Sequence, residues 1–203
     1  MDIYIATSNP HKAAEFSAMF AGAGIGCRVL SAADVPGFVP PVEDGTTFAE
    51  NALIKARALA KKAPRGAYVM ADDSGIAVDA LGGAPGIMSA RYAGVSGKGA
   101  DEANNRKLLR ELENVPDEKR SARFVCAIAL VCPDGSERVF SGKIEGVVGR
   151  GEKGLGGFGY DPLFFLPGRG MTTAEIPASE KNSVSHRGRA FAALAEFLKT
   201  KIS

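Results

Sequence analysis

The sequence predicts an α/β fold built on a mixed β-sheet and flanked by helices. Apolar segments typical of strands alternate along the chain with amphipathic segments typical of helices, a pattern that favours parallel strand pairs. Residues 122–149 instead predict a β-hairpin, and its antiparallel pair makes the sheet mixed. The length of 203 residues fits a single domain over 1–203, with room for two lobes.

The first half of the chain is expected to contain three strands and two helices. Asn9 can cap the first helix, and Pro10 suits its first turn. Thr47 and Glu50 form a capping-box pair at the start of the second helix, the clearest helix in the sequence. In order, we expect a strand over 3–7, a helix over 11–24, a strand over 27–32, a loop over 34–45, a helix over 46–64 and a strand over 67–72.

The second half is expected to contain the hairpin, a glycine-dense loop and two further helices. Pro133 and the Asp134-Gly135 pair supply the turn chemistry between the two hairpin strands. In order, we expect a sharp turn over 82–88, a helix over 101–114, strands over 122–132 and 137–149, a loop over 151–162, a short strand over 163–166 and a helix over 186–201.

Composition narrows the classes of partner and compartment. The formal net charge of +2 gives no strong electrostatic footprint for a nucleic-acid polymer, so we expect none as a partner. Cys27, Cys126 and Cys132 lack metal-type spacing and suggest reduced, buried thiols. The N-terminus does not resemble a signal peptide, and no apolar run reaches membrane-spanning length. A cytoplasmic location without a membrane partner is therefore expected.

Residues 6–12, ATSNPHK, lead from a predicted strand through a polar turn into a helix start. Backbone N–H groups and the helix dipole favour an anion at such a point, and Ser8 and Asn9 add donors. Lys12 lies one turn into the helix, where it can lean back over a phosphate. The alternative is a plain helix N-cap with Lys12 as a solvated charge, and the local sequence leaves both open.

Carboxylates from two segments predict a site for Mg²⁺. Asp72 and Asp73 follow the apolar run AYVM, and Glu43 precedes the second helix. Mg²⁺ prefers one or two carboxylates together with waters and phosphate oxygens, and a nearby carboxylate can orient or deprotonate a water. Ser74 and Gly75 open a predicted turn whose N–H groups suit a phosphate. The alternatives are an Asx turn at the strand end and acids that complement a helix dipole.

The stretch GGFGYDPLFF, residues 156–165, predicts a slot for a flat ring. Its glycines permit close backbone approach, and Phe158 and Tyr160 offer faces on which a base can stack. Asp161 is placed to accept a hydrogen bond from a base N–H group. The alternative is a tight turn whose aromatic side chains belong to the core.

A basic cluster, EKNSVSHRGRAF over residues 180–191, precedes and begins the last predicted helix. Lys181 and Arg187 are suited to phosphates or carbonyl groups, and His186 to a base oxygen. The alternative makes His186 a cap or surface residue. Arg189 is equally compatible with a surface position, and His11 is interpreted as structural.

Together these stretches predict a phosphate-binding loop, a metal site formed by carboxylates, a slot for an aromatic base and a cluster of basic side chains. This combination suits a nucleoside triphosphate. The motifs TSNPHK, GTTFAENALIKA, ADDSGIAVDALGGAPGIMSARYAG, GGFGYDPLFF and EKNSVSHRGRA follow one another along nearly the whole chain. In these motifs and their order the sequence resembles the inosine/xanthosine triphosphate pyrophosphatases, the non-canonical purine nucleoside triphosphate pyrophosphatases.

The resemblance implies a fold, an activity and an assembly. The implied fold is an elongated mixed sheet flanked by helices, with two lobes and a central active-site cleft. The implied reaction is Mg²⁺-dependent hydrolysis of dITP, ITP, XTP and dXTP to the monophosphate and pyrophosphate, which cleanses the nucleotide pool. The implied assembly is a homodimer.

The resemblance also assigns residues to roles. Asp73 is the implied catalytic base and, with Glu43, a metal ligand. His11 departs from the family motif, which commonly has a glycine just before its lysine. The implied substrate-binding residues are Thr7, Ser8, Asn9, Pro10, His11, Lys12, Ser74, Phe158, Gly159, Tyr160, Asp161, Lys181, His186 and Arg187.

Two other functions remain open on the sequence. One is a Maf-like nucleotide pyrophosphatase that acts on modified pyrimidines. The other is a nucleotide-binding sensor that performs no hydrolysis.

Overall fold

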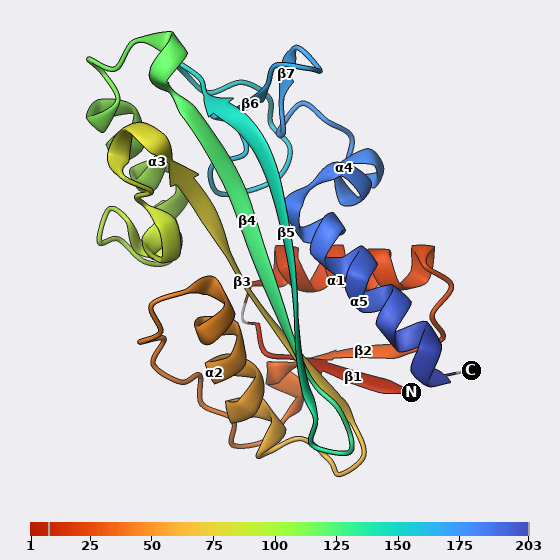
Figure 1. Cartoon of the computed structure of the whole chain (residues 1–203). Coiled ribbons are helices and arrows are strands. Elements are labelled where there is room, and N and C mark those ends of the chain that lie inside the picture. Colours follow the sequence, from red (N-terminus) through yellow and green to blue (C-terminus); the bar gives the residue numbers. More distant parts are fainter. Residues whose placement is uncertain (8, 203) are drawn as a thin grey trace. The chain divides into compact units, whose positions relative to one another are not determined.

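The structure is a computed structural model that describes residues 1–7 and 9–202. Within these residues a seven-stranded sheet has the order β2-β1-β3-β4-β5-β6-β7 (Figure 1). Strand β1 pairs in parallel with β2 and with β3, whereas β6 is antiparallel to both β5 and β7. The predicted α/β class and the predicted mixed sheet are therefore confirmed.

The helices and strands follow the predicted alternation. The strands are β1 Asp2–Ile5, β2 Arg28–Ser31, β3 Tyr68–Val78, β4 Ser121–Val131, β5 Glu137–Val148, β6 Phe164–Leu166 and β7 Met171–Thr172. The helices are α1 Pro10–Gly22, α2 Phe48–Ala60, α3 Ala100–Glu111, α4 Ala178–Val184 and α5 His186–Ile202.

The chain divides into two compact units, and each of the three longest strands contributes to both. Unit 1 consists of residues 1–73, 126–142 and 187–203, and unit 2 of residues 74–125 and 143–186. The boundary falls within β3, between the predicted metal ligand Asp73 and the predicted substrate contact Ser74.

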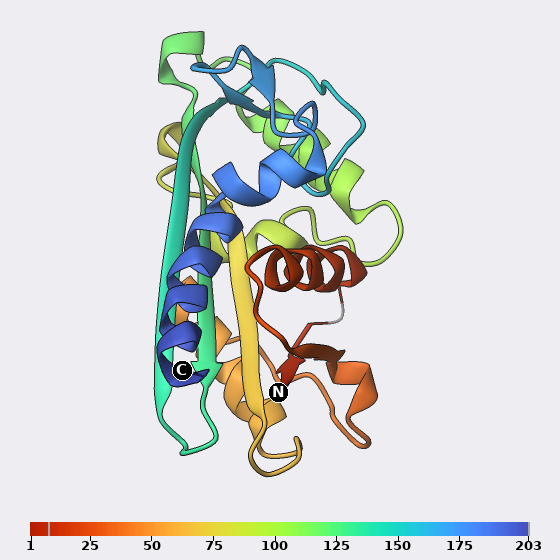
Figure 2. The ribbon, with the colours of Figure 1, turned by 90° about the vertical axis from the view of Figure 1, so that its right-hand side faces the viewer.

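Unit 1 has a hydrophobic core on each face of its sheet, because successive strand residues point to opposite faces. Ile3, Ile5 and Met70 pack with apolar side chains of α1 and α5. Their neighbours Tyr4 and Val69 pack with α2 instead. Helix α2 thus covers one face, and α1 with α5 covers the other (Figure 1). The turned view shows α5 alongside the hairpin strands β4 and β5, against which it packs in unit 1 (Figure 2).

Unit 2 has one core beneath α3. Leu108 of that helix and Leu112, which directly follows it, are fully buried and pack in one core with Ile76 of β3 and Phe124 of β4. Residues that follow the glycine-dense loop, such as Phe164, complete this core.

The local signals at the helix starts are confirmed. The Asn9 side chain accepts hydrogen bonds from the backbone N–H groups of His11 and Lys12, and Pro10 begins α1. Thr47 and Glu50 form the reciprocal capping box of α2. Helix α3 ends at Glu111, three residues before the predicted limit, whereas α4 and β7 were not predicted.

The predicted end of the third strand at Asp72, followed by a turn at Ser74 and Gly75, is wrong, because β3 continues to Val78. Asp is a poor strand residue, yet both carboxylates of the Asp72–Asp73 pair find basic partners, and tertiary contacts outweigh local propensity. Strand β1 ends at Ile5, opposite Met70, so the acidic pair lies just beyond the carboxyl end of β1. Open α/β sheets bind their ligands at such ends.

The predicted sharp turn over 82–88 is confirmed. Gly82, Gly83 and Gly86 all have positive φ, which glycine adopts without a steric penalty. Ser89 then packs back onto β3, where its Oγ accepts from the Ile76 N–H group at 2.9 Å and donates to the Gly86 carbonyl at 2.6 Å.

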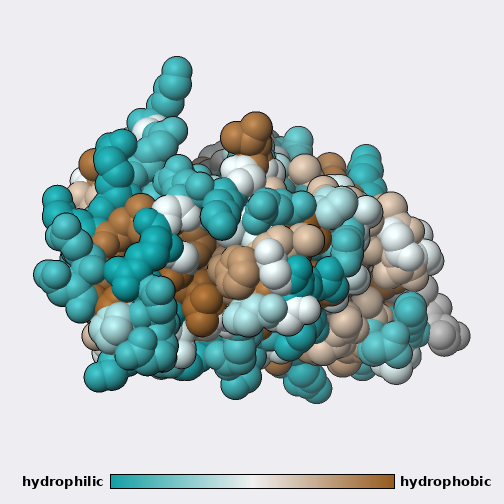
Figure 3. All heavy atoms as spheres, turned by 90° about the horizontal axis from the view of Figure 1, so that it is seen from above, coloured by the Kyte–Doolittle hydropathy of each residue, from teal (hydrophilic) through white to brown (hydrophobic). Residues whose placement is uncertain are grey.

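In the part of the chain described, no helix combines the length and apolar composition needed to cross a bilayer. The face drawn in Figure 3 carries hydrophilic side chains interspersed with smaller apolar areas.

Gly75→Ala should destabilise the protein by about 1–3 kcal/mol, the usual cost of overpacking. A Cβ at this position would lie only 2.6 Å from the Gly86 carbonyl oxygen and would collide with the Ser89 side chain. Gly26→Ala is the matched control, because nothing lies within 4 Å of its Cβ. Chemical denaturation measures both variants, and equal midpoints would contradict the packing of β3 against this turn.

Candidate active site

The predicted phosphate loop of unit 1 is organised by Asn9. Its Oδ1 accepts from the N–H groups of His11 at 2.9 Å and Lys12 at 3.3 Å, and its own N–H donates to Thr7 Oγ1 at 3.1 Å. Ser8, also predicted here, lies outside the described residues. The N-cap alternative is thus present in the structure, and Asn9 occupies backbone donors that the sequence offered to a phosphate.

Lys12 is not a solvated surface charge. Its ammonium lies 2.8 Å from Asp72 Oδ2, and the two side chains are 14% and 0% exposed. Arg187 of α5 contacts the same Asp72 oxygen at 3.3 Å and binds Glu15 of α1 at 2.6 Å. Burial alone would raise the pKa of Asp72, but Lys12 and Arg187 together hold that pKa far below its usual range.

Asp73 lies in a different environment with Glu43 and a lysine. Lys55 of α2 donates to Glu43 Oε2 at 2.9 Å and to Asp73 Oδ1 at 3.0 Å, so the two predicted metal ligands share one ammonium. Burial raises the pKa of Asp73, and the attraction of Lys55 does not fully offset it. The Lys55 pKa is raised, because the carboxylates outweigh the effect of its own burial.

Asn51 joins the Glu43 loop to the strand. Its Oδ1 accepts from the Gly45 N–H group at 2.9 Å, and its Nδ2 lies 3.4 Å from Asp73 Oδ2. The side chain is fully buried, and a Cβ on Gly45 would come within 2.7 Å of it. The approach of Glu43 to Asp73 therefore depends on Asn51.

This arrangement fits a divalent cation with oxygen ligands. The carboxylates of Glu43 and Asp73 both contact the Lys55 ammonium. Together they carry two negative charges, and Lys55 carries one positive charge. Among the described residues no group of three or more His, Cys, Asp or Glu side chains forms a metal cage. Two carboxylates completed by waters and phosphate oxygens is the donor set that Mg²⁺ prefers.

The second half of the glycine-dense loop, residues 156–161 of unit 2, carries Phe158 and Tyr160 and is called the aromatic loop below. It is held in place by its own residue Asp161. Its carboxylate accepts from the Phe158 N–H group at 2.9 Å, from Thr173 Oγ1 at 2.8 Å and from Lys181 Nζ at 2.6 Å. The Lys181 ammonium also lies 5.3 Å from the centroid of the Phe158 ring. A Cβ on Gly157 would collide with the Asp161 carboxylate, so the loop requires glycine there.

The remaining predicted residues of unit 2 are largely buried. Tyr160 is 5% exposed, and its hydroxyl donates to the Ser89 carbonyl at 2.8 Å. His186 is also 5% exposed and stacks on Phe124 with ring centroids 4.8 Å apart. Tyr160 thus has the core environment that the alternative interpretation described, and His186 is neither a surface residue nor solvated.

The structure gathers the predicted residues into three groups. The carboxylates of Glu43 and Asp73 meet in unit 1, and Asp161 and Lys181 meet in the aromatic loop of unit 2. Arg187, predicted to act with its neighbour His186, packs in unit 1 with Asp72 and Lys12, whereas His186 belongs to unit 2.

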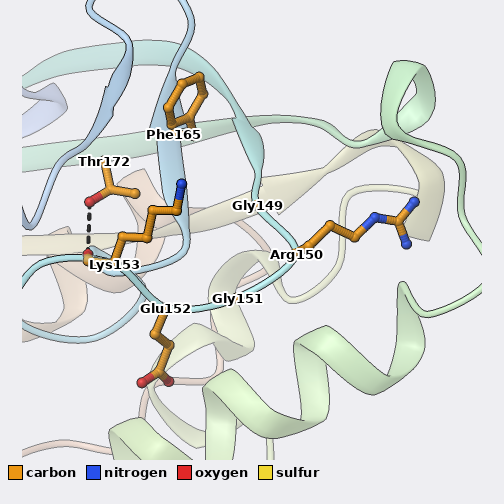
Figure 4. A pocket seen from close by; sticks show the side chains of 7 residues that line it. All are labelled: Gly149, Arg150, Gly151, Glu152, Lys153, Phe165 and Thr172. Carbon is orange, nitrogen blue, oxygen red and sulfur yellow. Dashed lines mark hydrogen bonds between the residues drawn. The ribbon is translucent and has the colours of Figure 1, made fainter.

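A separate cavity of about 300 Å³ lies in unit 2 behind the glycine-dense loop (Figure 4). Lys153 extends toward Phe165, whereas Glu152 and Arg150 point away from that ring (Figure 4). Arg150 is held elsewhere by Asp117. None of the predicted nucleotide-binding side chains is among the lining residues, which are Gly149, Arg150, Gly151, Glu152, Lys153, Phe165 and Thr172.

The sequence analysis missed Lys55 as a partner of the carboxylates, which Asn51 supports. Both lie on α2 four positions apart, so they project from one face of the helix. That face also carries the fully buried Ala52 and Ala56. Polar residues at this spacing within an apolar stripe were the available signal.

Fold and site together define an α/β protein in which a capped helix start lies beside buried, ion-paired carboxylates at the end of a parallel strand, an arrangement suited to phosphate chemistry. The chain belongs to the Ham1 family, which it matches over residues 3–197. The predicted family is confirmed.

The comparisons with known proteins cover nearly the whole chain. A dITP/XTP pyrophosphatase of Geobacter sulfurreducens is 50% identical over 97% of this chain and 96% of its own. The structure of a HAM1 protein from Coxiella burnetii has a TM-score of 0.86 at 37% identity and covers 98% of this chain and 99% of its own. The structure of a dITP/XTP pyrophosphatase from Mycobacterium abscessus has a TM-score of 0.75 at 47% identity, with 96% and 97% covered.

Asp72→Ala should cost about 3–5 kcal/mol of stability, because it leaves two buried cations without their shared carboxylate. Asp2→Ala is the control: it removes an ion pair with Arg28 in which both side chains are exposed to solvent, and it should cost little. Urea denaturation of both variants measures the difference. Equal losses would show that the buried pairs of Asp72 with Lys12 and Arg187 do not hold unit 1 together.

Proposed function

We propose that this protein hydrolyses non-canonical purine nucleoside triphosphates, namely ITP, dITP, XTP and dXTP, to the monophosphate and pyrophosphate. The observation that carries the proposal is the convergence of Glu43 and Asp73, from separate segments, on one ammonium beside the start of α1. The relatives named dITP/XTP pyrophosphatase support the substrate class and the class of enzyme, a hydrolase that acts on acid anhydrides.

In this proposal the side chains of unit 1 act on the triphosphate. Thr7, Asn9, His11 and Lys12 line its phosphates, together with Pro10 and Ser8 of the same segment. Ser74, the first residue of unit 2, also contacts substrate in this proposal. Glu43 and Asp73 would hold Mg²⁺. When bound, Mg²⁺ would supply positive charge that neutralises the phosphate oxygens and the departing pyrophosphate.

Asp73 is the proposed general base. It orients a water toward the α-phosphorus and takes its proton as the new P–O bond forms and the bond to the pyrophosphate oxygen breaks. A raised pKa makes the Asp73 carboxylate a stronger base than an ordinary aspartate, and the Lys55 ammonium lies 3.0 Å from one of its oxygens. Positioning and charge stabilisation account for most of the rate in this type of reaction.

The base is the proposed ligand of the aromatic loop in unit 2. Phe158, Gly159, Tyr160 and Asp161 shape the slot with Lys181, and His186 and Arg187 complete the set of proposed contacts. Hypoxanthine and xanthine carry a 6-oxo acceptor where adenine carries a donor. A buried protein donor left unpaired by adenine costs roughly 1–3 kcal/mol.

A homodimer and a cytoplasmic location remain predictions of this proposal. Size-exclusion chromatography with light scattering measures the first, and fractionation of cells that express the protein measures the second.

Asp73→Asn should lower kcat for ITP by roughly 100-fold or more, the usual contribution of a general base. Asp44→Asn, an exposed carboxylate beside Glu43, is the matched control and should stay near wild type. The assay separates pyrophosphate from orthophosphate for ITP, XTP, dITP, GTP and ATP.

Three results of that assay would count against the proposal. Binding of ITP by the wild type without any product would indicate a sensor. Release of orthophosphate would indicate a phosphatase, and a preference for modified pyrimidine nucleotides would favour the Maf-like function.

Mg²⁺ should raise the melting temperature of the wild-type protein, because it binds the folded state and neutralises Glu43 and Asp73. The rise should disappear after treatment with a chelator. It should also be lost in Glu43→Gln and in Asp73→Asn but kept in Asp44→Asn. A shift of the same size in all four proteins would place the ion elsewhere.

A further inference from the structure

We propose that Asp101 and Asn105 of α3 are positioning residues for the aromatic loop, and that they set affinity and selectivity for the base. The inference rests on the proposed function in one respect, namely that this loop binds the base. It adds two residues that neither the sequence analysis nor the proposed site contains.

The peptide groups on either side of Gly159 are held by these two side chains. The Gly159 N–H group donates to Asp101 Oδ2 at 2.8 Å, and Asn105 Nδ2 donates to the Gly159 carbonyl at 3.2 Å. Gly159 has a φ of +61°, the left-handed conformation that favours glycine. The middle of the loop, between the two aromatic residues, is therefore fixed by contacts from α3.

Asn105 anchors the loop at a second point. Its Nδ2 also donates to Glu152 Oε1 at 3.1 Å, so a single amide connects the start of the glycine-dense loop with its middle. Both partners are acceptors, which fixes the orientation of the amide. Asn105 is 3% exposed, and a buried amide whose bonds are lost leaves its partners unsatisfied.

Helix α3 provides a rigid support for these contacts. Asp101 and Asn105 are four positions apart and so lie on one face of the helix. The next residue toward the N-terminus, Asn104, bonds the Ala93 N–H group at 2.7 Å and the Ala90 carbonyl at 3.2 Å. Together with the buried Leu108, these contacts fix α3 in unit 2.

The loop is thus held on two sides. Asp161 holds the Phe158 N–H group, and α3 holds Gly159 immediately afterwards. A loop already ordered in its binding conformation loses less entropy when a ligand binds. Release of the α3 contacts should therefore weaken binding of the base without affecting the carboxylates of unit 1.

The test compares Asp101→Ala and Asn105→Ala with two further variants. Asp101→Asn keeps an oxygen that can accept from the Gly159 N–H group and should restore near wild-type behaviour. Arg106→Ala changes the exposed neighbour of Asn105 and is the matched control. If Asn105→Ala fails to fold, Asp101→Ala carries the test, because Asp101 is exposed.

Both alanine variants should raise KM for ITP by about tenfold, the order expected for lost hydrogen bonds to the loop, and leave kcat within about twofold. The ratio of kcat/KM for ITP over ATP should fall. Calorimetry should show weaker binding of inosine monophosphate, whereas inhibition by inorganic tripolyphosphate, which has no base, should be unchanged.

Three results would overturn the inference: unchanged binding of inosine monophosphate, an equal loss for tripolyphosphate and the nucleotide, or a failure of Asp101→Asn to restore binding. A wild type that binds inosine monophosphate but releases no pyrophosphate from ITP would contradict the proposed function alone, and calorimetry would still decide the role of α3. A wild type that binds no inosine monophosphate would overturn both.

Discussion

The buried carboxylate of Asp72 is the interaction on which the site in unit 1 depends. Lys12 of α1 and Arg187 of α5 both contact it, so one side chain of β3 connects two helices that are distant in sequence. A buried charge is tolerated only when it is neutralised, and Asp72 is fully buried. The position of Lys12, and with it the start of α1, follows from this requirement.

The adjacent residues Asp72 and Asp73 have different partners because a strand alternates its side chains. Met70, two residues before Asp72, lies in the core with α1 and α5, and Asp72 pairs with side chains of those helices. Ala71, two residues before Asp73, lies in the core with α2, and Asp73 pairs with Lys55 of α2. The two carboxylates of Asp72 and Glu15 pair with two cations, Lys12 and Arg187. The two carboxylates of Asp73 and Glu43 share a single cation, Lys55. Among the ion pairs of the described residues, the two carboxylates that share one lysine lie on the Asp73 side, which favours Asp73 over Asp72 as the proposed metal ligand.

Local chemistry made the helix starts predictable, because a cap such as Asn9 or the Thr47–Glu50 pair acts within four residues of sequence. Contacts between distant segments were not predictable in the same way. The sequence predicted that the strand ends at Asp72 and that a turn opens at Ser74, since strand propensity does not register that a lysine of α2 pairs with the Asp73 carboxylate. Lys55 was missed because a lysine in a helix usually faces water, and the pairing of Arg187 with Glu15 spans 172 positions.

The two units contribute different physical properties to the proposed reaction. In unit 2 the polar groups of the aromatic loop are bonded by other protein groups, as Asp161 is by Lys181 and the Phe158 N–H group, and as Gly159 is by Asp101 and Asn105. A loop whose polar groups are already hydrogen-bonded has little charge to offer a ligand but a well-defined shape, which is what selection among similar bases requires.

Unit 1 differs from unit 2 in its charge, since two carboxylates, Glu43 and Asp73, lie close to the single ammonium of Lys55. An interaction accelerates a reaction only if it is stronger in the transition state than in the ground state, and charge develops at the phosphates rather than at the base. In the proposed reaction, selection of the base and catalysis at phosphorus therefore belong to different groups of residues and can vary independently.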